Sequence, residues 1–271
     1  MQLFYQRFNV QEYLLFTLLG ITALVLVANF IGPDKGETAN NWFSIILSGV
    51  VMFLSVSMVS KYGLKGNHGK AWILFMLFSA YWFCAETVDV LYDVVLGSEP
   101  WEYADDFFYI TGYQLFFSSL VFYLRPFAKQ ISKKLVGVIT FASLILLMPS
   151  IIMIAGSGSW DSDSLILISY PILDSIILIP ALIGIVLFLK GGVNFMVSLL
   201  SLGIITQIVG DNSVLFLSLQ NHYYPGHVVD VLFLWTYVLF AFGLYHQIGL
   251  FSEKPNSNPC PACGKTCSGH K

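Results

Sequence analysis

Charged residues are scarce in this sequence. Asp, Glu, Lys and Arg together make up 11% of the 271 residues, whereas hydrophobic residues make up 56%. A soluble domain ordinarily carries about 25% charged residues, so water cannot be the solvent for most of this chain. The mean hydropathy of +0.75 leads to the same conclusion. The sequence therefore predicts an integral membrane protein in contact with the lipid bilayer.

Sequence motifs for catalysis are also missing. The chain has no glycine-rich phosphate-binding loop, no HExxH motif and no recognisable Ser/His/Asp constellation. Its net charge of −3 gives no basic surface that would bind nucleic acid. We therefore expect neither an enzyme nor a nucleic-acid-binding protein.

Long apolar runs are the dominant feature of the sequence. A helix needs roughly 20 mainly apolar residues to cross a hydrocarbon core of about 30 Å. The runs lack the two-residue alternation of spanning strands, so they favour helices. We predict an all-α integral membrane fold with eight transmembrane helices. The runs cover residues 13–31, 42–60, 71–94, 107–124, 135–155, 165–189, 194–217 and 229–250.

The distribution of Lys and Arg over the loops predicts the orientation. All of them except Lys35 fall on one side of the predicted helices, and the loops of the other side are acidic. Cytoplasmic loops retain Lys and Arg. We therefore predict a multi-pass protein of the cell membrane with both termini in the cytoplasm. The basic set is Arg7, Lys61, Lys65, Lys70, Arg125, Lys129, Lys133, Lys134, Lys190, Lys254, Lys265 and Lys271.

A weak internal repeat divides the chain into two parts. Most matches lie 124 positions apart, and one lies 122 positions apart. We predict tandem four-helix halves over residues 1–130 and 131–251, followed by a polar tail over 252–271. Because each half has an even number of helices, the halves are predicted to run parallel, related by an axis near the membrane normal. The matches are Asp106 with Asp230, Tyr113 with Tyr237, Leu115 with Leu239, Phe116 with Phe240, Leu120 with Leu244, and Asp89 with Asp211.

Ionisable side chains occur inside the predicted helices, where each costs a few kcal/mol on insertion scales. Glu86, Asp89 and Asp93 follow a spacing of i, i+3 and i+7 and therefore share one face of the third helix. Asp174 and Asp211 lie at similar depth in the sixth and seventh helices. The candidate ligand-binding residues are Glu86, Asp89, Tyr92, Asp106, Tyr109, Tyr113, Tyr170, Asp174, Asp211, Asp230 and Tyr237.

These carboxylates have no basic partner at their depth, because no Lys or Arg lies there in any predicted helix. A cationic ligand would satisfy carboxylates and aromatic faces together, since ring quadrupoles attract ammonium groups within about 6 Å. Our hypothesis is an outward-facing pocket for a small cationic or polar ligand. The alternative is that these groups hydrogen-bond from helix to helix as structural links, which contribute about 0.6 kcal/mol each.

The segment after Phe251 is polar and brings Cys and His residues close together in sequence. Thiolates and imidazole at such spacing can surround a tetrahedral Zn²⁺ ion, and the predicted cytoplasmic location favours reduced thiols. The alternatives are another soft metal such as copper, or a disordered tail without metal. The candidate ligands are Cys260, Cys263, Cys267 and His270.

Several short motifs together carry a likeness to a known group of membrane modules. They are Glu86, Pro100, the stretch Asp106-Phe-Phe-Tyr-Ile-Thr-Gly-Tyr113, the stretch Tyr170-Pro-Ile-Leu-Asp174, and Gly210-Asp211. With these motifs, residues 60–250 resemble the eight-helix N-terminal sensory modules of bacterial diguanylate cyclases and sensor kinases. They also resemble stand-alone membrane proteins of ammonia-oxidising archaea. The segment 100–106 departs from the family pattern, which tends to carry a second proline and a serine before the Asp.

The resemblance implies a sensory role, and the sequence as a whole leaves three functions open. The first is a membrane sensor or ligand-binding module, with the signal leaving through a separate cytoplasmic partner or the Cys-rich tail. The second is a transporter or an ion or proton channel, which would need a polar path to both sides. The third is a structural subunit of a larger membrane complex, in which Glu86 and Asp89 would enter helix contacts with no cavity beside them.

Overall fold

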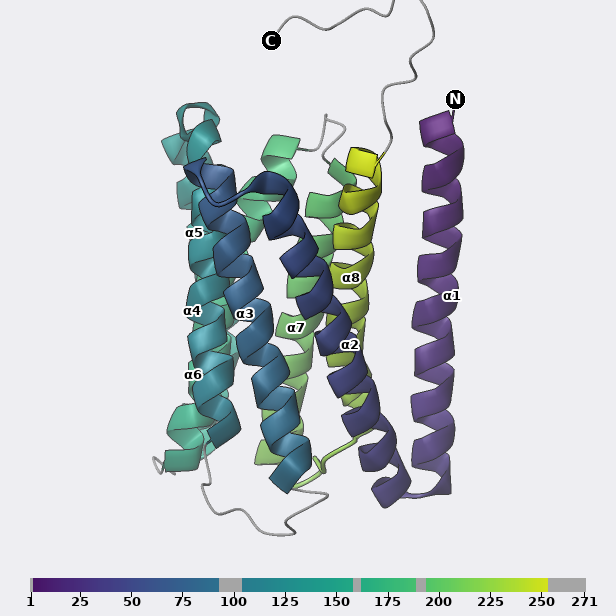
Figure 1. Cartoon of the computed structure of the whole chain (residues 1–271). Helices are drawn as coiled ribbons and strands as arrows, with labels where there is room; N and C mark the ends of the chain where they lie inside the picture. Colours follow the sequence, from purple (N-terminus) through teal and green to yellow (C-terminus); the bar gives the residue numbers. More distant parts are fainter. Residues whose placement is uncertain (1, 93–103, 158–161, 189–193, 253–271) are drawn as a thin grey trace, which may run out of the picture.

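The computed structural model describes residues 2–92, 104–157, 162–188 and 194–252 (Figure 1). Within these ranges every regular element is a helix, and no strand occurs. The helices are α1 (Gln2–Ile31), α2 (Pro33–Tyr62), α3 (Gly66–Val90), α4 (Ala104–Leu124), α5 (Lys133–Ser157), α6 (Ser162–Phe188), α7 (Asn194–Leu219) and α8 (Val231–Ser252), with 3₁₀ helices η2 (Arg125–Gln130) and η3 (Val228–Asp230).

Eight of these helices are long and apolar enough to cross a membrane. The predicted all-α, eight-helix membrane fold is therefore confirmed. The helix ends differ from the predicted ones because polar first turns continue the helix beyond the apolar run. The largest differences are at α1, which begins at Gln2 and not at residue 13, and at α2, which begins at Pro33 and not at residue 42. Proline is favoured at the first helical position, since its missing N–H would have no helical partner there.

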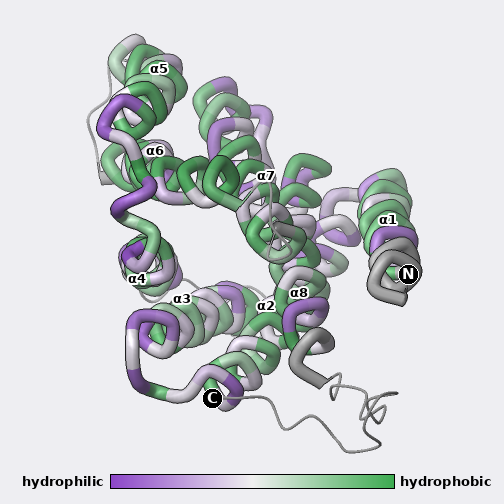
Figure 2. The backbone as a smooth tube through the Cα atoms, turned by 90° about the horizontal axis from the view of Figure 1, so that it is seen from above, coloured by the Kyte–Doolittle hydropathy of each residue, from purple (hydrophilic) through white to green (hydrophobic). Residues whose placement is uncertain are grey.

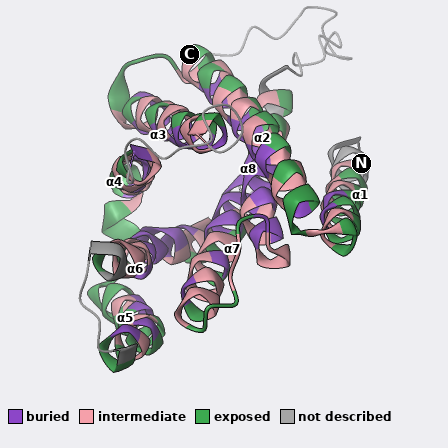
Figure 3. Cartoon of the chain, turned by 90° about the horizontal axis from the view of Figure 1, so that it is seen from below, coloured by how far each residue is buried: buried purple, intermediate pink, exposed green. Residues whose placement is uncertain are grey.

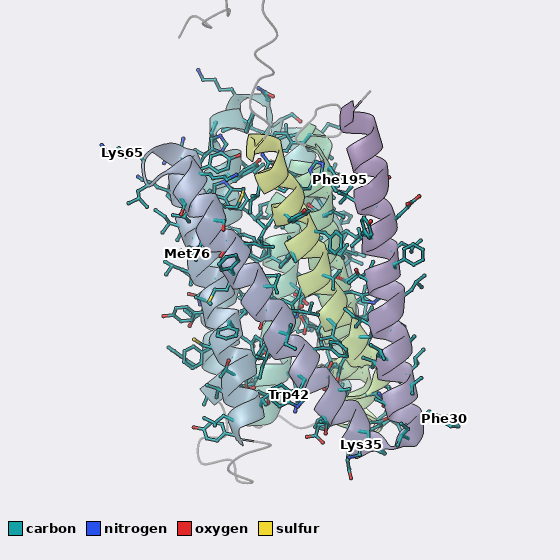
Figure 4. The ribbon with its side chains drawn as sticks, turned by 45° about the vertical axis from the view of Figure 1, so that its right-hand side comes forward. Phe30, Lys35, Trp42, Lys65, Met76 and Phe195 are labelled. Atoms are coloured by element: carbon teal, nitrogen blue, oxygen red, sulfur yellow. The ribbon has the colours of Figure 1, made fainter. Side chains whose placement is uncertain are left out.

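The helices run side by side along one direction, and α1 begins at the end of the bundle where α8 finishes (Figure 1). We call this the terminal end and the opposite one the distal end. Lys65 lies at the terminal end and Lys35 at the distal end (Figure 4). This is the separation of basic residues that the loop charges predict. Which end faces the cytoplasm stays a prediction.

The contacts between helices follow the same pattern in both predicted halves. Helix α2 packs against α1 and α3, and helix α6 packs against α5 and α7. Across the middle, α2 contacts α8 just as α6 contacts α4. Both α1 and α5 begin at the terminal end and lie at the periphery (Figure 2). The pattern agrees with two parallel tandem halves, and the duplication itself stays a prediction.

Aromatic rings fill the centre of the bundle. Phe78 stacks on Phe116 with ring centroids 4.3 Å apart, and Phe116 meets Phe240 at 5.4 Å. Phe75 completes this layer from α3, 5.5 Å from Phe116. All four side chains are buried. Phe116 and Phe240 are matched residues of the repeat, so the two predicted halves meet ring to ring in the centre.

The outward faces of the peripheral helices are apolar and exposed (Figures 2 and 3). Phe16 on α1 and Phe141 on α5 are 71% and 66% exposed. In a bilayer such side chains face lipid and not water. The polar side chains that could carry a function therefore have to be sought inside the bundle.

Candidate functional site

The distal half of the bundle encloses a cavity of about 420 Å³. Its wall is formed by α2, α3, α4, α6, α7 and α8, together with the segment that joins α7 to α8. The carboxylates on the wall are Glu86, Asp89, Asp105, Asp106, Asp211 and Asp230. The aromatic side chains on it are Trp82, Tyr109, Tyr170, Tyr223, Phe233 and Tyr237. No Lys, Arg or His is among the described residues that line it.

Most residues of the predicted ligand-binding set are brought together here. All of them line the cavity except Tyr92, Tyr113 and Asp174. Tyr113 and Asp174 lie next to the wall, because Tyr113 hydrogen-bonds to Asp211 of the lining. Tyr92 follows the end of α3, is half-buried and does not line the cavity. Asp93 lies outside the described residues.

Glu86 is the acceptor at the first of two carboxylate centres. The hydroxyl of Tyr237 on α8 donates to its Oε1 at 2.6 Å. Tyr109 and Ser44 also hydrogen-bond to this carboxylate. Glu86 is 7% exposed, so it is held by hydroxyl groups from three other helices in a site largely removed from solvent. We call Glu86 with Tyr237 the Glu86 centre.

The second centre lies on α4, α6 and α7. The Tyr113 hydroxyl lies 2.7 Å from Asp211 Oδ2 and 2.9 Å from Asp174 Oδ1, so it joins two carboxylates of different helices. Gln207, one turn before Asp211, donates to Oδ2 at 3.2 Å. Asp174 is 1% exposed, and its Oδ2 has no hydrogen-bond partner. We call Asp211, Tyr113 and Asp174 the Asp211 centre.

Two further carboxylates each accept a hydrogen bond from a tyrosine. Tyr170 on α6 donates to Asp106 at the start of α4. Tyr223 donates to Asp230, with its hydroxyl 3.3 Å and 3.4 Å from the two oxygens. Burial, and then the nearby charge of Asp230, raise the pKa of Tyr223 well above its ordinary value. Its hydroxyl therefore keeps the proton that it donates.

Trp82 lies between the two centres. Its ring centroid is 5.4 Å from that of Tyr113 and 6.0 Å from that of Tyr237. The indole Nε1 donates to the backbone oxygen of Tyr109 at 3.3 Å, which fixes the ring. A side chain at Gly112 would collide with this indole, so the glycine permits the close approach.

The segment between α7 and α8 closes one side of the cavity and is anchored to α1 and α2. Asn29 Nδ2 donates to the Gly226 oxygen at 3.0 Å, and the Tyr224 hydroxyl donates to Asn29 Oδ1 at 3.0 Å. Gly226 has a φ of 78° and lies against the backbone of Glu37. Only glycine fits there without strain, because a Cβ would overlap that backbone.

Sequence reasoning did not find several of the lining residues. Asn40, Asn41 and Ser44 line the cavity from α2, but they lie at the edge of the apolar run, where a loop was expected to end. Gln207 could have been found from its position one turn before Asp211 in an apolar helix. Asp105 belongs to the first turn of α4, not to a loop.

The candidate metal ligands of the tail lie outside the described residues, so zinc or copper binding there stays a prediction. In the part of the chain that is described, no three His, Cys, Asp or Glu side chains come close enough together to hold a metal ion. The carboxylates of the distal cavity are therefore spaced along its wall and not gathered at one point.

No family model, no curated protein and no solved structure matches the chain. The resemblance to bacterial sensory modules is thus left as an expectation from the motifs.

Proposed function

We propose that this protein is a membrane ligand-binding module whose distal cavity takes a small organic cation. The observation that carries the proposal is the composition of the wall. Six carboxylates and six aromatic side chains line about 420 Å³, and no basic side chain is among the described lining residues.

The negative charge of the carboxylates on the cavity wall has to be compensated. A carboxylate removed from water costs several kcal/mol unless it is paired or hydrogen-bonded. Hydroxyl groups of tyrosine supply part of this compensation at Glu86, Asp106, Asp211 and Asp230. They carry no positive charge, so a cationic ligand would add the electrostatic attraction that the described lining residues do not supply.

The aromatic side chains favour an organic cation over a bare metal ion. An ammonium group within about 6 Å of a ring face gains roughly 0.5–2 kcal/mol, the larger value applying where water is excluded. Trp82 and Tyr237, both on the wall, are buried. The spacing of the carboxylates also suits a ligand that extends across the cavity more than an ion held at one point.

The cavity supports binding over the two rival functions. A structural subunit would place Glu86 and Asp89 in helix contacts without a cavity, yet both line one. A channel or transporter needs a polar path to the terminal end, and the layer of Phe75, Phe116 and Phe240 lies across the centre of the bundle. On the terminal side of that layer the neighbouring cavity is apolar and measures about 30 Å³.

A sensory role is part of this proposal, and the way the centres join the predicted halves supports it. Tyr237 and Glu86 belong to different halves, as do Tyr113 and Asp211. A cation that takes over the carboxylates would change these bonds and thereby the contact between the halves. With the predicted orientation, the ligand would enter from outside and the signal would reach a cytoplasmic partner.

The test is a thermal-stability screen of the full-length, detergent-purified protein with a panel of amines and divalent metal ions. A ligand at one hundred times its Kd stabilises the native state by about 2.7 kcal/mol, so a bound amine raises the unfolding temperature. The same screen on Glu86→Gln and Asp211→Asn should lose most of that shift. Asp34→Asn is the matched control, because Asp34 is an exposed carboxylate at the same end of the bundle.

The outcome that contradicts the proposal is equally plain. If no amine raises the unfolding temperature of the wild-type protein, or if the shifts survive in both cavity variants, the cavity is not a cation site.

A further inference from the structure

The carboxylate and tyrosine groups of the cavity occur twice. Tyr237 on α8 donates to Glu86 on α3, and Tyr113 on α4 donates to Asp211 on α7. Tyr113 and Tyr237 are matched residues of the sequence repeat. Helices α3 and α7 likewise correspond in the two predicted halves. The acceptors are not matched residues, because the repeat pairs Asp211 with Asp89 and not with Glu86. The two centres share a donor at a matched position and an acceptor that belongs to the opposite predicted half.

The correspondence between the halves extends to the first turn of α4 and to η3, which directly precedes α8. Asp106 and Asp230 are matched residues, and each accepts a hydrogen bond from a tyrosine, Tyr170 in one case and Tyr223 in the other. The cavity thus presents two sets of acidic and aromatic side chains on a single wall.

Buried polar atoms without a partner occur at both centres. Asp174 Oδ2 in the Asp211 centre has no hydrogen-bond partner although the side chain is 1% exposed. Asn41 lines the cavity near Ser44, which bonds to Glu86, and its Nδ2 is also unpartnered at 6% exposure. A buried polar group without a partner loses about 1–3 kcal/mol. Asp174 Oδ2, next to the wall, can accept a hydrogen bond from an ammonium group or from water, whereas Asn41 Nδ2 is a donor and needs an acceptor, such as a water that accompanies the ligand.

We propose that the ligand is an alkane diamine or a longer polyamine, with one ammonium group at the Glu86 centre and another at the Asp211 centre. This inference rests on the proposed function and names its ligand class. Trp82 contacts tyrosines of both centres, so the two ammonium groups lie on either side of one indole. The alkyl chain between them packs against that ring, which lines the cavity.

Two linked ammonium groups bind more tightly than two separate ones. Once the first is held, the second is at millimolar effective concentration near its own centre, and the linked ligand can gain about 10²–10⁴-fold in affinity. A ligand too short to span the indole loses this gain, and one that is too long loses part of it.

Isothermal titration of the full-length protein in detergent with n-butylamine, 1,4-diaminobutane and 1,8-diaminooctane tests the inference. We expect at least one diamine to bind one molecule per chain, about a hundredfold or more tighter than butylamine. Glu86→Gln and Asp211→Asn should each reduce the affinity for that diamine to about the butylamine level. Asp34→Asn should leave it unchanged. The comparison of the three amines needs only the wild-type protein and therefore does not depend on the folding of a variant.

The remaining outcomes separate this inference from the proposed function. Equal affinity for butylamine and the diamines, or two diamines per chain, overturns the two-centre ligand while the cation cavity stands. Tighter binding of Mg²⁺ or Ca²⁺, titrated in parallel, than of any amine contradicts both the two-centre ligand and the preference for an organic cation. Absence of binding by all three amines overturns the proposed function, and the inference with it.

Discussion

The distal and terminal halves of the bundle are built from the same helices but are filled differently. In the distal half, carboxylates and tyrosines surround about 420 Å³ of space. In the terminal half, the corresponding cavity measures about 30 Å³ and is lined mainly by apolar and aromatic residues. Dense apolar packing stabilises a bundle, whereas an open polar cavity inside a membrane costs free energy. The difference indicates that dense packing in the terminal half stabilises the bundle, whereas the distal half leaves space between its polar side chains.

Removing the aromatic layer should have the largest effect on stability. Phe116→Ala deletes a ring that contacts Phe75, Phe78 and Phe240, and we expect it to lower the free energy of unfolding by about 3–5 kcal/mol. Thermal unfolding in detergent measures this. The control is Phe141→Ala, since Phe141 is 66% exposed to the lipid side and its loss should cost under about 1 kcal/mol. Equal losses in the two variants would show that the layer has no special role.

The wall segment between α7 and α8 offers a second test. Gly226→Ala places a Cβ against the backbone of Glu37 in addition to straining a residue at φ 78°. We expect a loss of about 2–3 kcal/mol and weaker amine binding, because the segment must move. Gly63→Ala has a similar φ of 71° with open space around it, so its cost of about 1–3 kcal/mol comes from backbone strain alone, and amine binding should be unchanged. If the two variants lose the same stability and neither weakens amine binding, the segment is not a fixed wall.

Within the distal half, the tyrosine hydroxyls should contribute different amounts to the free energy of unfolding. Tyr113→Phe leaves Asp174 and Asp211 without their shared donor and is expected to cost about 1–3 kcal/mol. Tyr237→Phe removes a single bond to Glu86, which Tyr109 and Ser44 still contact, so we expect a smaller loss of about 1 kcal/mol. Tyr245→Phe on α8, with 62% exposure, is the neutral control. The reverse order of Tyr113→Phe and Tyr237→Phe in unfolding measurements would contradict this assignment.

The smallest effect is expected from a polar pair nearer the terminal end. Ser55 and Ser79 join α2 to α3 through their hydroxyls, 2.8 Å apart, with both side chains buried. Ser55→Ala should cost about 0.6 kcal/mol, the usual value of an interhelical hydrogen bond in a membrane. Its amine affinity should equal that of the wild type. A tenfold change in affinity would mean that polar groups far from the cavity also take part in binding.

Much of the fold could be predicted because lipid imposes a simple rule. A spanning segment has to be long, apolar and helical, and the apolar runs marked all eight helices. The ends were less accurate because a polar first turn, such as that of α2 from Pro33, carries no hydropathy signal. Asn40 and Asn41 were missed as wall residues for that reason, although both line the cavity.

The site was predictable in composition but not in detail. A carboxylate inside an apolar helix is conspicuous, so Glu86 and Asp211 could be found from the sequence alone. Their hydrogen-bond partners could not, because Tyr237 is 151 positions from Glu86 along the chain. No local pattern tells which tyrosine of one helix meets which acid of another. The hydrogen bonds from Tyr113 to Asp174 and Asp211 could be recognised only once the packing of the helices was known.

A neutral analogue of the ligand shows most directly whether the distal carboxylates bind through positive charge. The most direct measurement is isothermal titration of the wild-type protein with 1,4-diaminobutane and with 1,4-butanediol, its neutral analogue of similar size, repeated on Glu86→Gln. We expect binding of the diamine, no measurable binding of the diol, and a loss of diamine affinity of about tenfold or more in the variant, corresponding to about 1.4 kcal/mol. Equal binding of the two compounds, or diamine binding that Glu86→Gln leaves unchanged, would contradict binding through positive charge.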